Sequence, residues 1–474
     1  MATIEAPVAD HLDLGDHNHH AVGLRRDALS FTETLAQSIA NIAPTLTPAV
    51  NLQLVFGSSG NGTWFTYLLA TLGLLLIGVC IKQFARKTST PGALYSYVSM
   101  SLGRTAGFIT GWALILAYLA TGIAVASYTV PYAQTLLHNM HFAVPVVVMF
   151  FALVVGLVWL IAYKDVRISA KMMLGLEGVS ITLILILGAV MIAHTGLHLG
   201  SQLSLKGMTL NGLQGGMVLG IFSFVGFESA TALGAEAKNP RRNIPRAVFM
   251  STAIAGAFFI LMSLVMVSAF SGYKTHLDDP NLVALSAMAE IAHAPVLGVL
   301  VSFGAIISLF ACTLACVTAT SRILLSMSRD GLIHAHLGKS HHTNATPHVA
   351  ATACALLMFA VLAGLFLKGF AILDIYNMNG TIATYGFLLA YVLIAVGAVV
   401  SASRDKTLSA WLIFSAVVGT VFMGLAVKGS ISPWPAAPDN YLPEIFGVYM
   451  VLGLIWMFVD RQRSGPKFRL SSGN

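Results

Sequence analysis

Charged side chains are scarce in this sequence. Only 9% of its 474 residues are Asp, Glu, Lys or Arg, whereas 57% are hydrophobic. Because soluble domains carry about 25% charged residues, this composition excludes an ordinary soluble protein and predicts an integral membrane protein with the lipid bilayer as its surroundings. The net charge of +7 does not indicate a nucleic-acid partner, since the positive residues alternate with apolar segments instead of gathering on one surface.

Cysteine is also rare, and its placement excludes a disulfide framework. The four cysteines, Cys80, Cys312, Cys316 and Cys354, all fall inside apolar segments, where a thiol acts as a small apolar group. Cys312 and Cys316 share one helix face, so a metal or redox pair is the alternative to simple packing. The sequence lacks a P-loop, a His-Glu-x-x-His motif and a Ser/His/Asp grouping at membrane depth, so we expect no enzyme, cofactor or metal.

The first 24 residues lack the basic region and apolar core of a signal peptide. They are polar and acidic, which predicts a solvated cytosolic tail. Metal capture by His17, His19 and His20 is the alternative for this segment.

Twelve apolar segments are long enough to cross a bilayer, which takes about 20 mainly apolar residues in a helix. The predicted fold class is therefore an all-α integral membrane protein with twelve transmembrane helices. These spans lie near residues 31–56, 64–82, 105–133, 142–163, 168–194, 213–236, 246–270, 294–323, 349–367, 372–400, 407–427 and 442–459. After the second span, residues 89–98 are too polar to cross and predict a short amphipathic helix on the cytosolic side.

Lys and Arg are unevenly distributed between the loops, which predicts the orientation. If the N-terminus is cytosolic, 22 of the 26 lie on the cytosolic side, and Lys206, Lys274, Lys368 and Lys428 fall in separate outer loops. We therefore expect a multi-pass protein of the cell membrane with both termini cytoplasmic. Its predicted parts are a tail at 1–24, a core at 25–400, peripheral helices at 401–460 and a tail at 461–474.

The first span carries the signal of an interrupted helix. Pro44 and Pro48 each remove a backbone donor and disfavour helix at the preceding residue. Thr45 and Thr47 lie between them, so we predict an unwound segment lined by hydroxyls. A proline-kinked packing helix is the alternative.

The sixth span carries a second break candidate around residues 223–228. Glu228 lies near its middle, where a charge is costly and predicts a functional site that faces a cavity or a partner. Gly226 offers a place for the helix to unwind, which is tolerated at that depth only beside protein or water. The first and sixth spans are five apart, the spacing expected of broken helices in two corresponding five-span halves.

Other polar groups lie inside the predicted spans. Glu177 in the fifth span shares a helix face with Ser180, and we interpret it as proton-sensitive, with a structural hydrogen bond to a neighbouring helix as the alternative. Tyr118 in the third span and Asn377 and Thr381 in the tenth either line a pathway or bond across helices.

Four motifs together resemble the amino acid–polyamine–organocation permeases. They are Gly-Phe-Glu-Ser at 226–229, Glu-Ala-Lys-Asn-Pro-Arg-Arg-Asn-Ile-Pro-Arg at 236–246, Pro-Gly-Ala-Leu-Tyr at 91–95 and Ser-Arg-Asp-Gly-Leu at 328–332. The resemblance extends from about Leu24 to the end of the tenth span. It implies a LeuT-type fold with inverted repeats at about 31–194 and 213–400, broken helices 1 and 6, and peripheral helices 11 and 12.

The resemblance also implies a substrate held between spans 1, 3, 6, 8 and 10. It assigns residues 41–46 to the unwound part of span 1, Phe222 to an aromatic gate, Val225 and Gly226 to the pocket floor, and Glu228 to proton-sensitive release. The sequence departs from the family in two places. Ala-Pro-Thr-Leu-Thr-Pro at 43–48 stands where a Gly-rich segment is common, and Ser180 stands near the position of a lysine in several proton-coupled members.

We therefore expect a secondary transporter of amino acids or related amines that works by alternating access, as a symporter with H⁺ (or Na⁺) or as an exchanger. Half-helix ends suit a zwitterion, because free N–H groups face its carboxylate and free carbonyls face its ammonium group. The alternatives are a polyamine or ethanolamine carrier and a membrane sensor that does not transport. Glu228 and Glu177 are the proton-coupling candidates. The expected substrate-binding residues are Asn41, Ile42, Ala43, Thr45, Leu46, Thr47, Tyr118, Phe222, Ser223, Val225, Gly226, Phe227, Asn377 and Thr381.

Overall fold

A computed structural model describes residues 24, 27–137, 141–164, 166–271, 276–279, 282–432 and 434–464. Within these residues the chain is helical, and the one β-bridge joins Leu29 to Ala237. The predicted tails at 1–24 and 461–474 lie outside the described residues, except for Leu24 and the last residues of the final helix.

Ten described segments are long and apolar enough to cross a membrane. One of them, Phe31–Ala85, holds α1 (Phe31–Ile42), η2 (Thr47–Asn51), α2 (Leu52–Ser59), η3 (Gly60–Gly62) and α3 (Thr63–Ala85). Seven of the others coincide with α5 (Arg104–Ser127) plus α6 (Thr129–Leu136), α7 (Val144–Lys164), α11 (Pro240–Phe270), α13 (Pro295–Arg329), α14 (His348–Leu367), α15 (Ile372–Arg404) and α16 (Ala410–Ile431). The remaining two, Gly175–Thr195 and Asp439–Val459, cover parts of α8 (Val166–Thr195) and α17 (Leu442–Ser464).

This count differs from the predicted twelve only around the two interrupted spans. The first span merges with the second in the long segment Phe31–Ala85, and the sixth contributes α10 (Leu210–Phe222), an apolar helix too short to cross alone, followed by η4 (Ser229–Leu233). The multi-pass helical architecture is confirmed, and twelve complete crossings stay a prediction.

Local sequence explains where the first helix begins. The Ser30 N–H donates to Glu33 Oε2 at 2.7 Å, while Glu33 N–H donates to Ser30 Oγ at 3.4 Å. This reciprocal pair is a capping box, which satisfies two donors that a helix start would leave free. It sets the start of α1, which runs for twelve residues from Phe31 to Ile42.

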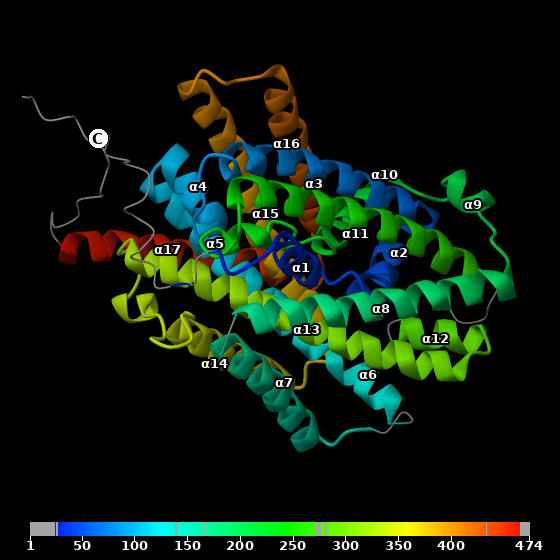
Figure 1. Cartoon of the computed structure of the whole chain (residues 1–474). Helices are drawn as coiled ribbons and strands as arrows, with labels where there is room; N and C mark the ends of the chain where they lie inside the picture. The colour runs from blue at the N-terminus through cyan, green and yellow to red at the C-terminus, as the bar shows by residue number, and fades with distance from the viewer. Residues whose placement is uncertain are drawn as a thin grey trace, which may run out of the picture.

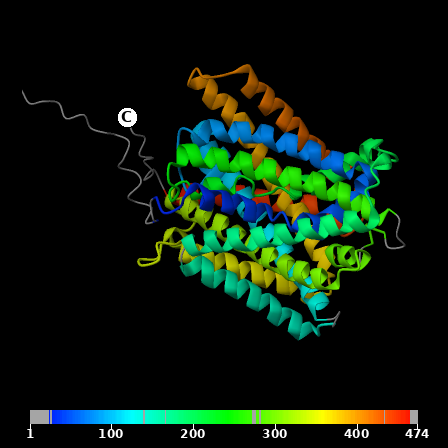
Figure 2. The ribbon, with the colours of Figure 1, turned by 45° about the vertical axis from the view of Figure 1, so that its right-hand side comes forward.

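The interior of the bundle holds the two interrupted spans. Figures 1 and 2 show α1 between α3 and α11 on one side and α8 and α13 on the other. The segment Arg104–Leu136 is the most enclosed, with 83% of its apolar window buried, against 22% for Asp439–Val459. The last helices, α16 and α17, therefore lie at the periphery, and their exposed apolar side chains, among them Trp411, Val417, Val448 and Ile455, are suited to contact lipid.

The short helices mark the two ends of the bundle. The predicted amphipathic helix is α4 (Ala93–Leu102), which lies at the same end as η5 (Ala335–Gly338) in Figure 1, whereas α9 (Gly200–Leu203) and α12 (Ala284–Ile291) lie at the opposite end. At the α4 end the Tyr95 hydroxyl donates to Asp330 Oδ2 at 2.5 Å. Two of the motifs quoted above, at 91–95 and 328–332, therefore meet in space.

Candidate functional site

The first span is broken where the prolines predicted. Helix α1 ends at Ile42, Ala43 adopts the left-handed conformation with φ of 46°, and residues 44–45 form a turn before the chain resumes helical geometry. The resumed segment η2 is a π-helix with Pro48 in its first turn. The residues that flank the break, including Ile42, Leu46 and Thr47, are buried.

The sixth span is broken as well. Helix α10 ends at Phe222, residues 223–228 form successive turns, and η4 continues as a 3₁₀-helix. Gly226 has a φ of +88°, which a side chain would strain, and a Cβ there would lie 2.2 Å from Asn41 Nδ2. The absence of a side chain at Gly226 thus allows the two breaks to meet directly.

Polar contacts join α1 to η4 beyond the breaks. The Ser38 hydroxyl donates to Phe227 O at 2.7 Å and accepts from Ala230 N–H at 3.1 Å. The Ser229 hydroxyl donates to Gln37 O at 3.2 Å. Together with the backbone pairing of Leu29 around Ala237, these bonds hold α1 and the chain after the second break as one unit.

Glu228 is the last residue of the second break, and it is fully buried. The Tyr118 hydroxyl donates to Glu228 Oε1 at 2.6 Å, and the Tyr391 hydroxyl donates to Oε2 at 2.7 Å. The carboxylate thereby links the sixth span to α5 and α15. The Tyr118 ring packs edge-on against Phe387, and its predicted substrate contact stays a prediction.

Glu177 lies at a second buried junction, beside the first break. Its Oε1 accepts from Thr45 N–H at 3.3 Å and from Thr45 Oγ1 at 3.2 Å. Its Oε2 accepts from the Ser308 hydroxyl at 2.5 Å. Glu177 therefore connects α8 both to the break in the first span and to α13. Ser180 donates to Gly304 O at 2.6 Å, so it connects α8 to α13 alone.

Aromatic rings pack together where α10 ends at the second break. Phe222 packs edge-on against Tyr376 with ring centroids 5.9 Å apart, and a Cβ at Gly380 would lie 2.9 Å from the Phe222 ring. The Tyr376 hydroxyl donates to Asn51 Oδ1 at 2.6 Å. The next residue, Ser223, has its Oγ 3.3 Å from the Tyr67 hydroxyl.

The expected substrate-binding residues did not include several of these residues. Tyr376, Gly380, Phe387 and Tyr391 follow helical spacing along α15, so this regular face is the signal that would have found them. Asn377 and Thr381 are half-buried positions next to that face, and their substrate contact stays a prediction. Val225 and Phe227 are buried within the second break, where Phe227 packs against Tyr391 at 5.3 Å.

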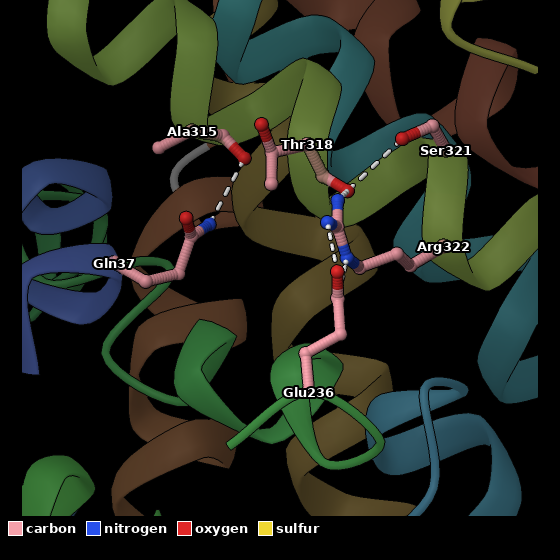
Figure 3. Close-up of polar contacts among 6 residues, drawn as sticks. All are labelled: Gln37, Glu236, Ala315, Thr318, Ser321 and Arg322. Atoms are coloured by element: carbon pink, nitrogen blue, oxygen red, sulfur yellow. Dashed lines mark hydrogen bonds and ion pairs between the residues drawn. The ribbon is translucent and has the colours of Figure 1, made fainter. Parts of the chain in front are cut away.

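A buried ion pair connects the unit formed by α1 and the chain after the second break to α13, at the end of the bundle that holds α4. Arg322 on α13 donates through Nε and Nη2 to the two oxygens of Glu236, at 2.7 and 3.1 Å. Figure 3 shows the pair beside Gln37, whose amide donates to Ala315 O at 3.2 Å. The Arg322 side chain is 3% exposed and that of Glu236 is fully buried, so this pair is part of the core and not a surface contact.

Comparison with known proteins identifies the family. Residues 34–427 match the family described as amino acid permease. The chain belongs to that family. Its members are permeases and do not form an enzyme family, which agrees with a multi-pass helical bundle built around two broken spans.

Several curated relatives are transporters. The methylthioribose transporter of Bacillus subtilis (strain 168) is 27% identical over 302 residues, covering 61% of this chain and 64% of that relative. The branched-chain amino acid permease BcaP of the same strain is 24% identical over 422 residues, covering 85% and 83%. The vacuolar cationic amino acid transporter 4 of Arabidopsis thaliana is 24% identical, covering 70% of this chain and 56% of that relative. The first and third matches thus span less than two thirds of the relative's length.

Proposed function

We propose that this permease carries amino acids across the cell membrane by alternating access, with the substrate held where the two broken spans meet. The observation that carries the proposal is the meeting of two interrupted helices at Asn41 and Gly226, with Glu228 buried directly behind them. Interrupted helices place polar groups and helix dipoles where the two charged groups of an amino acid can bind. This function needs no covalent chemistry and no resident cofactor.

The proposed topology follows the inverted-repeat plan. Repeats at about 31–194 and 213–400 would each begin with a broken helix, and α16 and α17 would add two peripheral spans, giving twelve crossings. The end that holds α4 and η5 would face the cytoplasm, together with both termini, because Lys and Arg gather there.

We assign proton coupling to Glu228 and Glu177. Each is a buried carboxylate that joins a break to neighbouring spans, so protonation would weaken the bonds that connect the break to those spans. Na⁺ is the alternative coupling ion.

Neutral amino acids fit the site better than polyamines. Both oxygens of Glu228 already accept phenolic hydrogen bonds, which leaves this carboxylate less available to a cationic substrate. The surrounding side chains Ile42, Leu46, Phe222 and Val225 are apolar, which favours an apolar substrate side chain. The branched-chain permease among the relatives supports the same substrate class.

Purified protein in sealed liposomes tests the proposal. Labelled L-leucine should accumulate inside, faster with an inward proton gradient, and other zwitterions should compete better than diamines. Stronger competition by diamines would support the polyamine carrier. Binding without accumulation would support a sensor and overturn the transport function.

A further inference from the structure

The break in the first span offers few backbone donors. Pro44 and Pro48 have no N–H, Ala43 N–H donates to Ile39 O at 3.0 Å, and Leu46 N–H donates to Ala43 O at 2.8 Å. Thr45 N–H is taken by Glu177. Of the six residues 43–48, only Thr47 has an N–H that is not accounted for in this way, so the backbone here is poorly equipped to bind a carboxylate.

Asn41 supplies the missing donor. Its side chain is buried, with 2% of the residue exposed, and its Nδ2 has no hydrogen-bond partner among the described residues. That nitrogen points at the second break, 2.2 Å from the position of a Cβ at Gly226. A buried amide N–H₂ without a partner is costly, so a ligand that accepts from it gains affinity.

Two thiols of α13 fix this orientation. The Cys316 thiol donates to Asn41 Oδ1 at 3.2 Å, and the Cys312 thiol donates to Asn41 O at 3.3 Å. Cys312 and Cys316 are one turn apart on the same helix face. Because Oδ1 is held by Cys316, the amide cannot turn its oxygen toward Gly226 without losing that bond.

We propose that Asn41 binds the substrate carboxylate through its side-chain amide, in place of the backbone donors that the prolines remove, and that Cys316 is the positioning residue that keeps the amide turned toward the second break. This inference rests on the proposed function and adds the group that recognises the carboxylate. The Cys312 thiol supports it by engaging the backbone carbonyl of the same residue. The alternative is that both thiols only fill space between α1 and α13.

The test compares L-leucine with 3-methylbutylamine, which has the same side chain and amine but no carboxylate. Both are measured in proteoliposomes, leucine by its KM for uptake and the amine by its inhibition constant against leucine uptake. Asn41→Ala should raise the leucine KM about 10- to 100-fold, as expected for a lost hydrogen bond to a charged group, and leave the amine constant within about twofold. Asn41→Asp should reverse the preference toward the amine, since a carboxylate would then face a carboxylate.

The thiol variants separate positioning from packing. Cys316→Ala should raise the leucine KM about 3- to 10-fold with maximal rate and amine inhibition retained. Cys316→Ser keeps a donor and should restore the wild-type KM. Cys354→Ala is the matched control, because Cys354 is an equally buried cysteine on α14 and should leave both constants unchanged. In an Asn41→Ala background, Cys316→Ala should have no further effect.

Two outcomes would overturn the inference while leaving transport intact. One is an equal loss of leucine and amine binding in the Asn41 variants, and the other is a Cys316→Ala protein that behaves like Cys354→Ala. If Asn41→Ala does not fold, the inference is tested with Asn41→Asp, Cys316→Ala and Cys316→Ser. A wild-type protein that accumulates no amino acid would instead refute the proposed function and this inference with it.

Discussion

The buried ion pair between Arg322 and Glu236 gives the sharpest prediction about stability. Arg322→Ala removes two N–H donors from a carboxylate that is fully buried, and with them the Nη1 bond to Thr318 O at 3.0 Å. Removing one partner of a buried pair typically costs about 3–5 kcal/mol, because the remaining charge is left uncompensated. Thermal unfolding of the purified protein in detergent should therefore show a marked loss of stability.

The exposed pair between Lys87 and Asp405 is the matched control. Its side chains are 41% and 46% exposed, and Lys87 holds the pKa of the Asp405 carboxyl below its usual range by donating a hydrogen bond to it. Lys87→Ala should nevertheless leave the unfolding temperature almost unchanged, because water screens an exposed pair. Equal effects of Lys87→Ala and Arg322→Ala would refute the reasoning.

A double variant tests whether charge is the cause. Arg322→Met with Glu236→Leu removes both charges and keeps most of the buried volume, so it should be less destabilised than either single change. If the destabilisation of the double variant instead equals the sum of the two single effects, the two charges do not depend on each other. The loss of stability in Arg322→Ala would then have a cause other than an uncompensated charge.

Three further predictions concern the breaks. Glu228→Gln should flatten the pH dependence of initial uptake rates while the protein stays folded, because an amide cannot titrate; an unchanged pH profile would remove Glu228 from coupling. Gly226→Val should abolish substrate binding measured by ligand-induced thermal stabilisation, since its Cβ would meet Asn41 Nδ2 at 2.2 Å, and retained affinity would place the pocket elsewhere. Glu177→Ala leaves the Thr45 N–H and hydroxyl without their acceptor, which costs about 1–3 kcal/mol for each buried group, so it should lower the unfolding temperature. Glu177→Gln keeps a carbonyl acceptor and should lower the unfolding temperature by less.

The helices could be predicted from sequence because local chemistry decides them. A run of about 20 apolar residues has few alternatives to a membrane helix, so predicted spans such as 349–367 and 372–400 agree closely with α14 and α15. The breaks were predictable for a similar reason. Pro44 and Pro48 lack donors, and Gly226 adopts a φ that other residues avoid.

The partners of the buried carboxylates could not be predicted in this way. Glu228 is 110 residues from Tyr118 and 163 residues from Tyr391, so these pairs depend on how α5 and α15 pack against the second break. Polarity predicts a role for Asn377, whereas packing brings the neighbouring Tyr376 against Phe222. Polarity shows which side chains need partners, and only the packing of the spans shows which partners they have.

Helix α13 is the common support for both breaks. Its residues Ser308, Cys312, Cys316 and Arg322 contact in turn Glu177, the two oxygens of Asn41, and Glu236. The bonds between α1 and η4 lie within the unit, whereas the bonds of Cys312, Cys316 and Arg322 join the unit to α13, and the Ser308 bond joins α13 to α8. The proposed alternating access would therefore move the unit against α13 and keep α1 and η4 together, because that path breaks one ion pair, the Gln37 bond to Ala315 and two thiol bonds, and preserves the shared site at Asn41 and Gly226.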